Sequence, residues 1–133
     1  MQEFLNELST NLIYIKHEIK KGICHIYCES KNIKNKPVHA RQERIIKDLP
    51  FGDKAVELHI LSKRFYRTGG GTYAERFDFI NSTGRRTKRM DGKILESNLE
   101  GSVVGTERTL KQLGINVSDS TILRMFKKNE KNR

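Results

Sequence analysis

The stretch Ile23-Cys24-His25-Ile26-Tyr27-Cys28 decides how the fold of the N-terminal half is interpreted, because it holds both cysteines of the chain. Its spacing of thiols and histidine is compatible with part of a zinc site. The same residues also fit an extended strand in which Cys24, Ile26 and Cys28 share one face, and a buried free cysteine packs as a small hydrophobic residue. We therefore predict an inward-facing strand with no metal, no other cofactor and no disulfide. The alternative left open is weak metal binding by Cys24 and Cys28 with His39 or His25, and less readily with His59.

The residues before this stretch predict the first half of a β-hairpin. Ile13, Ile15 and Ile19 fall on one alternating face, and Lys20-Lys21-Gly22 supplies the residues of a turn that leads into the cysteine strand. Residues 30–37 are polar and basic, contain a proline, and predict a loop.

Apolar and polar residues alternate again from Val56 to about Tyr66, which predicts a further strand. The glycine-rich segment 68–71 predicts a turn into a short strand at 72–77. Together with the hairpin, these segments predict a small antiparallel β module that occupies residues 1–79.

Residues 80–133 show the spacing of helices instead. Met90 and Ile94 lie four positions apart and predict a first helix, and segment 103–113 predicts a second that ends at a glycine. Ser118 is a suitable N-cap for a third helix. A helix, a glycine-containing turn and an N-capped helix are typical of a helix-turn-helix, so the predicted fold class is α+β, with a β module followed by a helix-turn-helix module.

The last helix would present its N-terminal turns to the major groove of DNA. This assignment commits Ile122, Leu123, Met125 and Phe126 to the core. The predicted base contacts are Ser120, Thr121 and Arg124. The predicted contacts to the DNA backbone are Ser118, Lys127, Lys128, Arg85, Arg86, Lys88 and Arg89. The alternative is a helical hairpin with a basic, solvated face that binds no DNA.

The charge of the chain supports a polyanionic partner. The formal net charge is +10, and residues 81–133 carry 12 lysines and arginines against 6 acidic residues. The N-terminus lacks the pattern of a signal peptide, and no apolar run reaches the length of a membrane span. We therefore expect a cytoplasmic protein without a membrane partner, and the sequence does not indicate an oligomeric state.

Five segments, taken in order, resemble the N-terminal region of bacterial insertion-sequence transposases of the ISL-three type. They are ICHIYCESK, VHARQERIIKDLP, VELHILSKRF, TYAERFDF and LKQLGINVSDSTILRMFKK. The resemblance implies a zinc-ribbon module followed by a helix-turn-helix, which together recognise the terminal repeats of the element. In that family a DDE nuclease domain comes afterwards.

The sequence departs from that family in two respects. Residues 32–37 and 66–71 occupy the positions of the family's two cysteine knuckles and contain no cysteine, so the resemblance implies a degenerate, metal-free ribbon. The chain given ends at Arg133, where the nuclease domain would follow, so we expect no catalysis. The first hypothesis is thus a transposase-derived protein that binds double-stranded DNA, as a repressor or a competitor at transposon ends. The second is a small basic inhibitor or adaptor that binds a nucleic-acid enzyme.

Overall fold

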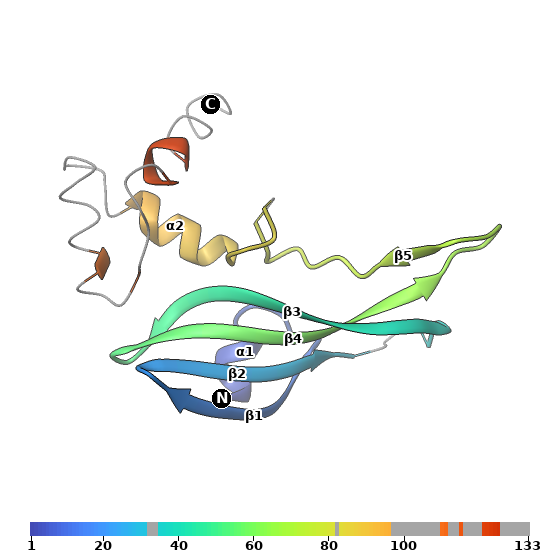
Figure 1. Ribbon diagram of the computed structural model, residues 1–133, viewed down its shortest axis with the longest axis horizontal. Helices are drawn as coiled ribbons and strands as arrows, with labels where there is room; N and C mark the ends of the chain where they lie inside the picture. The colour runs from blue at the N-terminus through green and yellow to red at the C-terminus, as the bar shows by residue number, and fades with distance from the viewer. Residues whose placement is uncertain (32–34, 82, 97–109, 112–114, 116–120, 126–133) are drawn as a thin grey trace.

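The computed structural model describes residues 1–31, 35–81, 83–96, 110–111, 115 and 121–125 of the chain. Short helices accompany a single sheet (Figure 1), which confirms the α+β class. The elements, in chain order, are α1 (Gln2–Asn6), β1 (Leu12–Lys20), β2 (Ile23–Ser30), β3 (Val38–Phe51), β4 (Lys54–Tyr66), β5 (Thr72–Ala74) and α2 (Lys88–Glu96).

The five-stranded sheet has the order β1-β2-β4-β3, and the short strand β5 pairs antiparallel with the last residues of β4. Strands β1 and β2 form one antiparallel hairpin, and β3 and β4 form a second. The inner strands of these hairpins, β2 and β4, run parallel to each other, with Cys24 opposite Val56 and Cys28 opposite Ile60. The prediction of an antiparallel module is therefore wrong for this pair. After β2 the chain first forms the edge strand β3. It then turns back at Gly52 (φ 63°), and the returning strand β4 pairs with β2.

The first hairpin confirms the predicted turn, because Lys21 (φ 53°) and Gly22 (φ 78°) both adopt the left-handed conformation of a tight hairpin turn. The predicted isoleucine face is wrong. A bulge between Tyr14 and Lys16 shifts the register, so that Ile13 pairs with Glu29 and Ile19 with Cys24, on opposite faces of the sheet. Ile13, Ile15 and Ile19 are 37%, 50% and 58% exposed.

The core covers one face of the sheet. Cys24, Ile26 and Cys28 alternate with half-buried residues along β2 and are almost completely buried, which confirms the inward-facing strand. They pack with Leu58 and Ile60 of β4, as do other buried residues from α1, β1, β3 and the segment after β5. Those residues are Leu5, Leu12, Ile46 and Ile80, and Val56 of β4 joins them. Both thiols are free and buried, and burial raises the pKa of Cys28 to about 12.

A second apolar cluster lies around α2, which runs beside β3 (Figure 1). Met90 and Ile94 are buried in it, as their spacing predicts, together with Leu110, Ile115 and Ile122. Positions 110–111 and 121–125 are helical, and the other positions of the predicted helix-turn-helix lie outside the described residues. The helix-turn-helix therefore stays a prediction. Leu123 is 47% exposed, so its predicted place in the core is wrong.

One buried ion pair joins the helical segment to the sheet. Asp48 of β3 is 2% exposed and accepts hydrogen bonds from Thr87 Oγ1 at 2.6 Å and from Arg89 Nε at 2.9 Å. Arg89 Nη2 lies 2.5 Å from the other carboxylate oxygen, and Arg89 Nη1 reaches Glu7 beyond α1 at 3.2 Å. Residues on both sides of the predicted boundary at 79/80 thus contact the sheet. Among the described residues, no helix is long and apolar enough to cross a membrane.

Candidate functional site

The loop between residues 80 and 88 is built on β3. Lys47 N donates to the Arg85 carbonyl oxygen and Thr87 N donates to the Lys47 carbonyl oxygen, each at 2.9 Å. Asn81 Oδ1 accepts from the backbone N–H of Arg85 at 3.2 Å and from Thr83 Oγ1 at 2.8 Å. An asparagine side chain that bonds to the backbone in this way fixes a tight loop. The loop therefore presents Arg85, which is exposed, at a defined position beside α2.

This loop forms one side of a hollow of about 290 Å³. Its lining comes from the loop, from α2 and from the described helical positions near the C-terminus: Asn81, Thr83, Arg85, Arg86, Asp91, Thr121, Arg124 and Met125. Four of these residues were predicted to contact DNA on separate grounds, two as backbone contacts and two as base contacts. The structure brings the two groups together around one concave surface.

The hollow carries a basic lining. Its charged residues are three arginines and one carboxylate: Arg85, Arg86, Arg124 and Asp91. Arg86 Nε donates to Asp91 Oδ1 at 2.6 Å, and the side chains of this pair are 15% and 23% exposed, so Arg86 is held in place by its partner. Arg85 and Arg124 are the exposed arginines of the lining. Their guanidinium groups have the planar, multiply donating geometry that suits phosphate oxygens and guanine edges.

The other residues predicted to contact DNA lie on α2 or outside the described residues. Lys88 is exposed at the start of α2, whereas Arg89 uses its donors on Asp48 and Glu7 and stacks over the Phe4 ring at 4.6 Å. A DNA phosphate would have to compete with these partners, so Arg89 serves to hold α2 on the sheet. Ser118, Ser120, Lys127 and Lys128 lie outside the described residues.

The structure separates the residues that were considered as alternative metal ligands. Cys24 and Cys28 face the core, and their desolvation raises the pKa of both thiols above the ordinary range. His25 alternates with them and lies on the other face of β2. His39 is on β3, edge-on to the Tyr66 ring at 5.0 Å. The proposed set of Cys24, Cys28 and His39 is therefore not brought together as a ligand group within the described residues.

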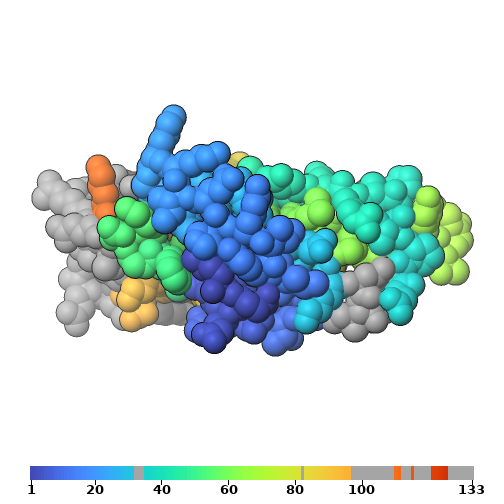
Figure 2. Space-filling model, turned by 90° about the horizontal axis from the view of Figure 1, so that it is seen from below, coloured from blue at the N-terminus to red at the C-terminus, as the bar shows by residue number. Residues whose placement is uncertain are grey.

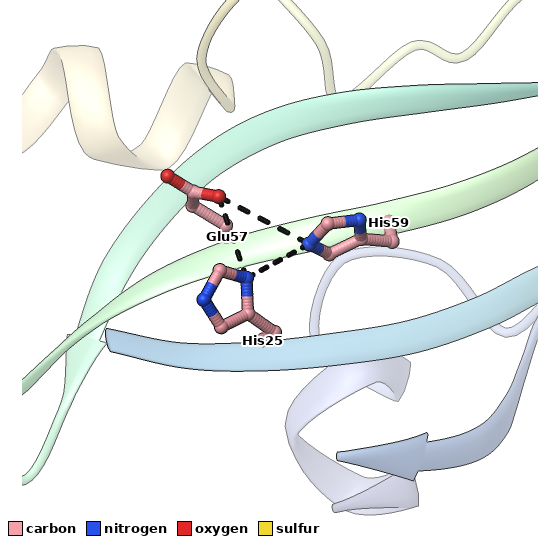
Figure 3. Close-up of side chains that lie close together, drawn as sticks. All are labelled: His25, Glu57 and His59. Carbon is pink, nitrogen blue, oxygen red and sulfur yellow. Dashed lines mark hydrogen bonds and ion pairs between the residues drawn. The ribbon is translucent and has the colours of Figure 1, made fainter. Parts of the chain in front are cut away.

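Sequence reasoning missed a different cluster on the face of the sheet opposite the core. His25 of β2 and both Glu57 and His59 of β4 point toward one another (Figure 3). His25 Nδ1 lies 3.0 Å from His59 Nε2 and 3.5 Å from Glu57 Oε2. The parallel register places His25 directly beside Glu57 and Tyr27 beside His59. Alternation along each strand predicts the face of each residue, but it contains no signal for this pairing of distant strands.

Comparison of the chain with models of protein families, with curated proteins and with solved structures finds no match. The resemblance to transposases of the ISL-three type therefore stays a prediction.

Proposed function

We propose that this protein binds double-stranded DNA through the surface around the hollow between the 80–88 loop, α2 and residues 121–125. The observation that carries the proposal is the convergence of Arg85 and Arg86 with Thr121 and Arg124. The charge excess of residues 81–133 supports it as well, since neutralising phosphates is the main source of affinity in most protein–DNA complexes. The protein acts by occupancy, as a repressor or competitor at its site, without cutting the DNA.

The residues of this surface have separate tasks. Arg85, exposed on the loop, contacts the sugar-phosphate backbone and fixes the position of the protein on the duplex. Arg124 and Thr121 project from the same helical segment, whose buried side is occupied by Ile122, and read base edges. Asp91 keeps Arg86 oriented through their ion pair and limits the surface on one side, because a carboxylate repels phosphate.

The test begins with selection of duplexes from a random library and continues with fluorescence anisotropy on the selected site at several salt concentrations. Arg85→Ala should weaken binding to all duplexes alike and lower the salt slope by about 1. Arg124→Ala should cost about 1–3 kcal/mol on the selected site and much less on random DNA. Arg41→Ala is the matched control, since Arg41 is an exposed arginine near the start of β3, outside the hollow. Binding without salt dependence, or equal effects of the three substitutions, contradicts the proposal.

A second candidate function is the inhibition of a nucleic-acid enzyme by direct contact, and β1 is the observation that favours it. Within the described part of the chain, β1 has a strand neighbour on one side only and carries the exposed side chains of Ile15 and Ile19. It lies on the surface seen in Figure 2, next to α1. An open edge with apolar side chains can accept a strand from a partner. One stoichiometric protein partner in host extract, with no selected DNA site, would favour this function over the first.

A further inference from the structure

We propose that His25, Glu57 and His59 form a binding site for a divalent zinc ion, separate from the DNA-binding surface. The site has two imidazole nitrogens and one carboxylate oxygen, a ligand set found in zinc sites that keep one position open for water. It lies on the solvent side of the sheet, whereas the cysteines of the chain face the core. The proposal rests on the spacing of the ligand atoms, the partner of His59 and the local charge.

The three ligand atoms have the spacing that a zinc ion requires. The distances are 3.0 Å from His25 Nδ1 to His59 Nε2, 3.5 Å from His25 Nδ1 to Glu57 Oε2 and 4.0 Å from His59 Nε2 to Glu57 Oε2. Tetrahedral zinc with bonds of about 2.0–2.1 Å places its ligands about 3.3–3.4 Å apart. Within the plane of the three atoms, the equidistant point lies about 2.1 Å from each of them, close to the length of a zinc–ligand bond. Adjustments of a few tenths of an ångström complete the geometry.

Glu43 of β3 orients His59 for this role. Its Oε1 lies 2.7 Å from His59 Nδ1, and because a carboxylate can only accept, the neutral imidazole carries its proton on Nδ1. The lone pair of Nε2 is then directed at the centre of the cluster. A carboxylate behind a ligating histidine is the usual arrangement in zinc sites, where it fixes the ring and raises its basicity. The Tyr27 ring, stacked on His59 with centroids 4.5 Å apart, further restricts the imidazole.

His25 completes the site from the neighbouring strand. Without a metal, its Nδ1–H donates to His59 Nε2, and its other ring nitrogen points away from the cluster (Figure 3). Zinc binding requires this proton to move to that outer nitrogen, which a neutral imidazole permits. The side chains of His25 and Glu57 are 20% and 26% exposed, so an ion can enter from solvent and keep a water as its fourth ligand.

The charge of the surroundings matches that of the ion. Two neutral imidazoles with the carboxylates of Glu57 and Glu43 supply two negative charges near the dication. Lys47 and Glu18 are the cross-strand neighbours of Glu57 and His25, and Glu18 is itself ion-paired with Lys16 and Lys20, so the charge offered to the ion comes from Glu57 and Glu43. The donor set also selects among metals, because imidazole favours zinc and its transition-metal neighbours whereas calcium and magnesium prefer sites made only of oxygen.

The test is calorimetric titration of zinc chloride into the full chain after removal of metals with a chelator. One equivalent should bind. His25→Asn and Glu57→Gln should abolish stoichiometric binding, and Glu43→Gln should weaken it about 10–100-fold at the same stoichiometry. His39→Asn is the matched control and should bind as the unsubstituted chain does. Each variant is compared without metal by circular dichroism and thermal melting, so that loss of binding is distinguished from loss of fold.

Cobalt substitution identifies the ligands independently. The cobalt complex should show visible absorption of a four- or five-coordinate nitrogen and oxygen site, without the near-ultraviolet charge-transfer band of a thiolate. Replacement of both cysteines by alanine should leave zinc affinity unchanged. The proposal is overturned if the folded chain binds no stoichiometric zinc, if His25→Asn still binds it, or if binding depends on Cys24 and Cys28.

Discussion

Asp48→Asn tests whether one buried ion pair holds α2, and with it the proposed DNA-binding surface, on the sheet. The Asp48 side chain is fully buried, and its two oxygens meet Nε and Nη2 of Arg89 at 2.9 and 2.5 Å in a two-pronged arrangement. The Thr87 hydroxyl donates to the same carboxylate. Asparagine has nearly the same shape, but it is neutral and turns an NH2 group toward donors, so the substitution removes the charge of the pair while it keeps the volume.

The size of the destabilisation depends on the contacts that Arg89 keeps after Asp48 is replaced. Loss of one partner from a buried ion pair costs about 3–5 kcal/mol, because the other charge stays without compensation. Here the Arg89 side chain is 21% exposed, keeps Glu7 at 3.2 Å and lies over the Phe4 ring. Water and these contacts offset part of the loss, so we expect a destabilisation of about 3 kcal/mol, at the lower end of that range. This is a large share of the ~5–15 kcal/mol that stabilises a typical domain.

The assay is urea unfolding at pH 7, followed by far-ultraviolet circular dichroism, with the free energies obtained by linear extrapolation. Asp53→Asn is the control, because Asp53 is 88% exposed beside Lys54 and its replacement should leave the midpoint unchanged. The double variant Asp48→Leu with Arg89→Met should recover most of the loss, since apolar residues of similar volume can replace a buried pair. The reasoning is refuted if Asp48→Asn costs less than about 1 kcal/mol, or if the double variant is no more stable than the single one.

Two further predictions concern the core and the open edge of the sheet. Because burial raises the pKa of Cys28 to about 12, the folded state holds the thiol proton that the unfolded chain releases above about pH 8.5–9, so stability should fall between pH 9 and 12. The free energy of unfolding, measured in urea up to pH 10.5, should therefore decline less steeply in Cys28→Ala, by at most ~1.4 kcal/mol per pH unit, and identical slopes would contradict the assignment. Ile19→Lys, at a side chain 58% exposed, should change the free energy of unfolding by less than about 0.5 kcal/mol. If β1 is a protein-binding edge, the same variant should lose its partner in a pull-down, and retention of the partner would exclude this edge.

The local sequence pattern predicted the strands that carry alternating apolar residues. It did not predict which strands pair with each other. The inward face of Cys24 and Cys28 follows from period-two alternation, and the buried positions of Met90 and Ile94 follow from helical spacing. Strand β3 was not predicted as such, because it is an edge strand whose first half carries exposed polar side chains without alternation. Alternation also fixes the face of a residue but not the neighbouring strand, so the parallel pairing of β2 with β4 has no signature in either segment.

The same limit applies to the two candidate sites. Arg85 and Arg124 were predicted as DNA contacts one at a time, from charge and helix position, but their meeting at one hollow depends on how the loop docks on β3. His25 and His59 are 34 positions apart and become neighbours only through the sheet register. A shift of that register by one residue would send one histidine to the core face and abolish the cluster. The bulge in β1 shows that such shifts occur in this chain.

Strand β3 links the two sites, and its pairing argues that they act independently. Glu43 reaches His59 at one position of β3, whereas Lys47 and Asp48 hold the 80–88 loop and α2 about four residues further along. Between these positions β3 pairs with β4 residue by residue, and Ile46 is buried in the main core, so a ligand at one end has no hinge through which to move the other. Asp48→Asn should therefore loosen the helical segment and weaken DNA binding while the His25–Glu57–His59 cluster keeps its geometry. Zinc affinity that falls in parallel with DNA affinity in this variant would show instead that the sheet and the helical segment unfold as one unit.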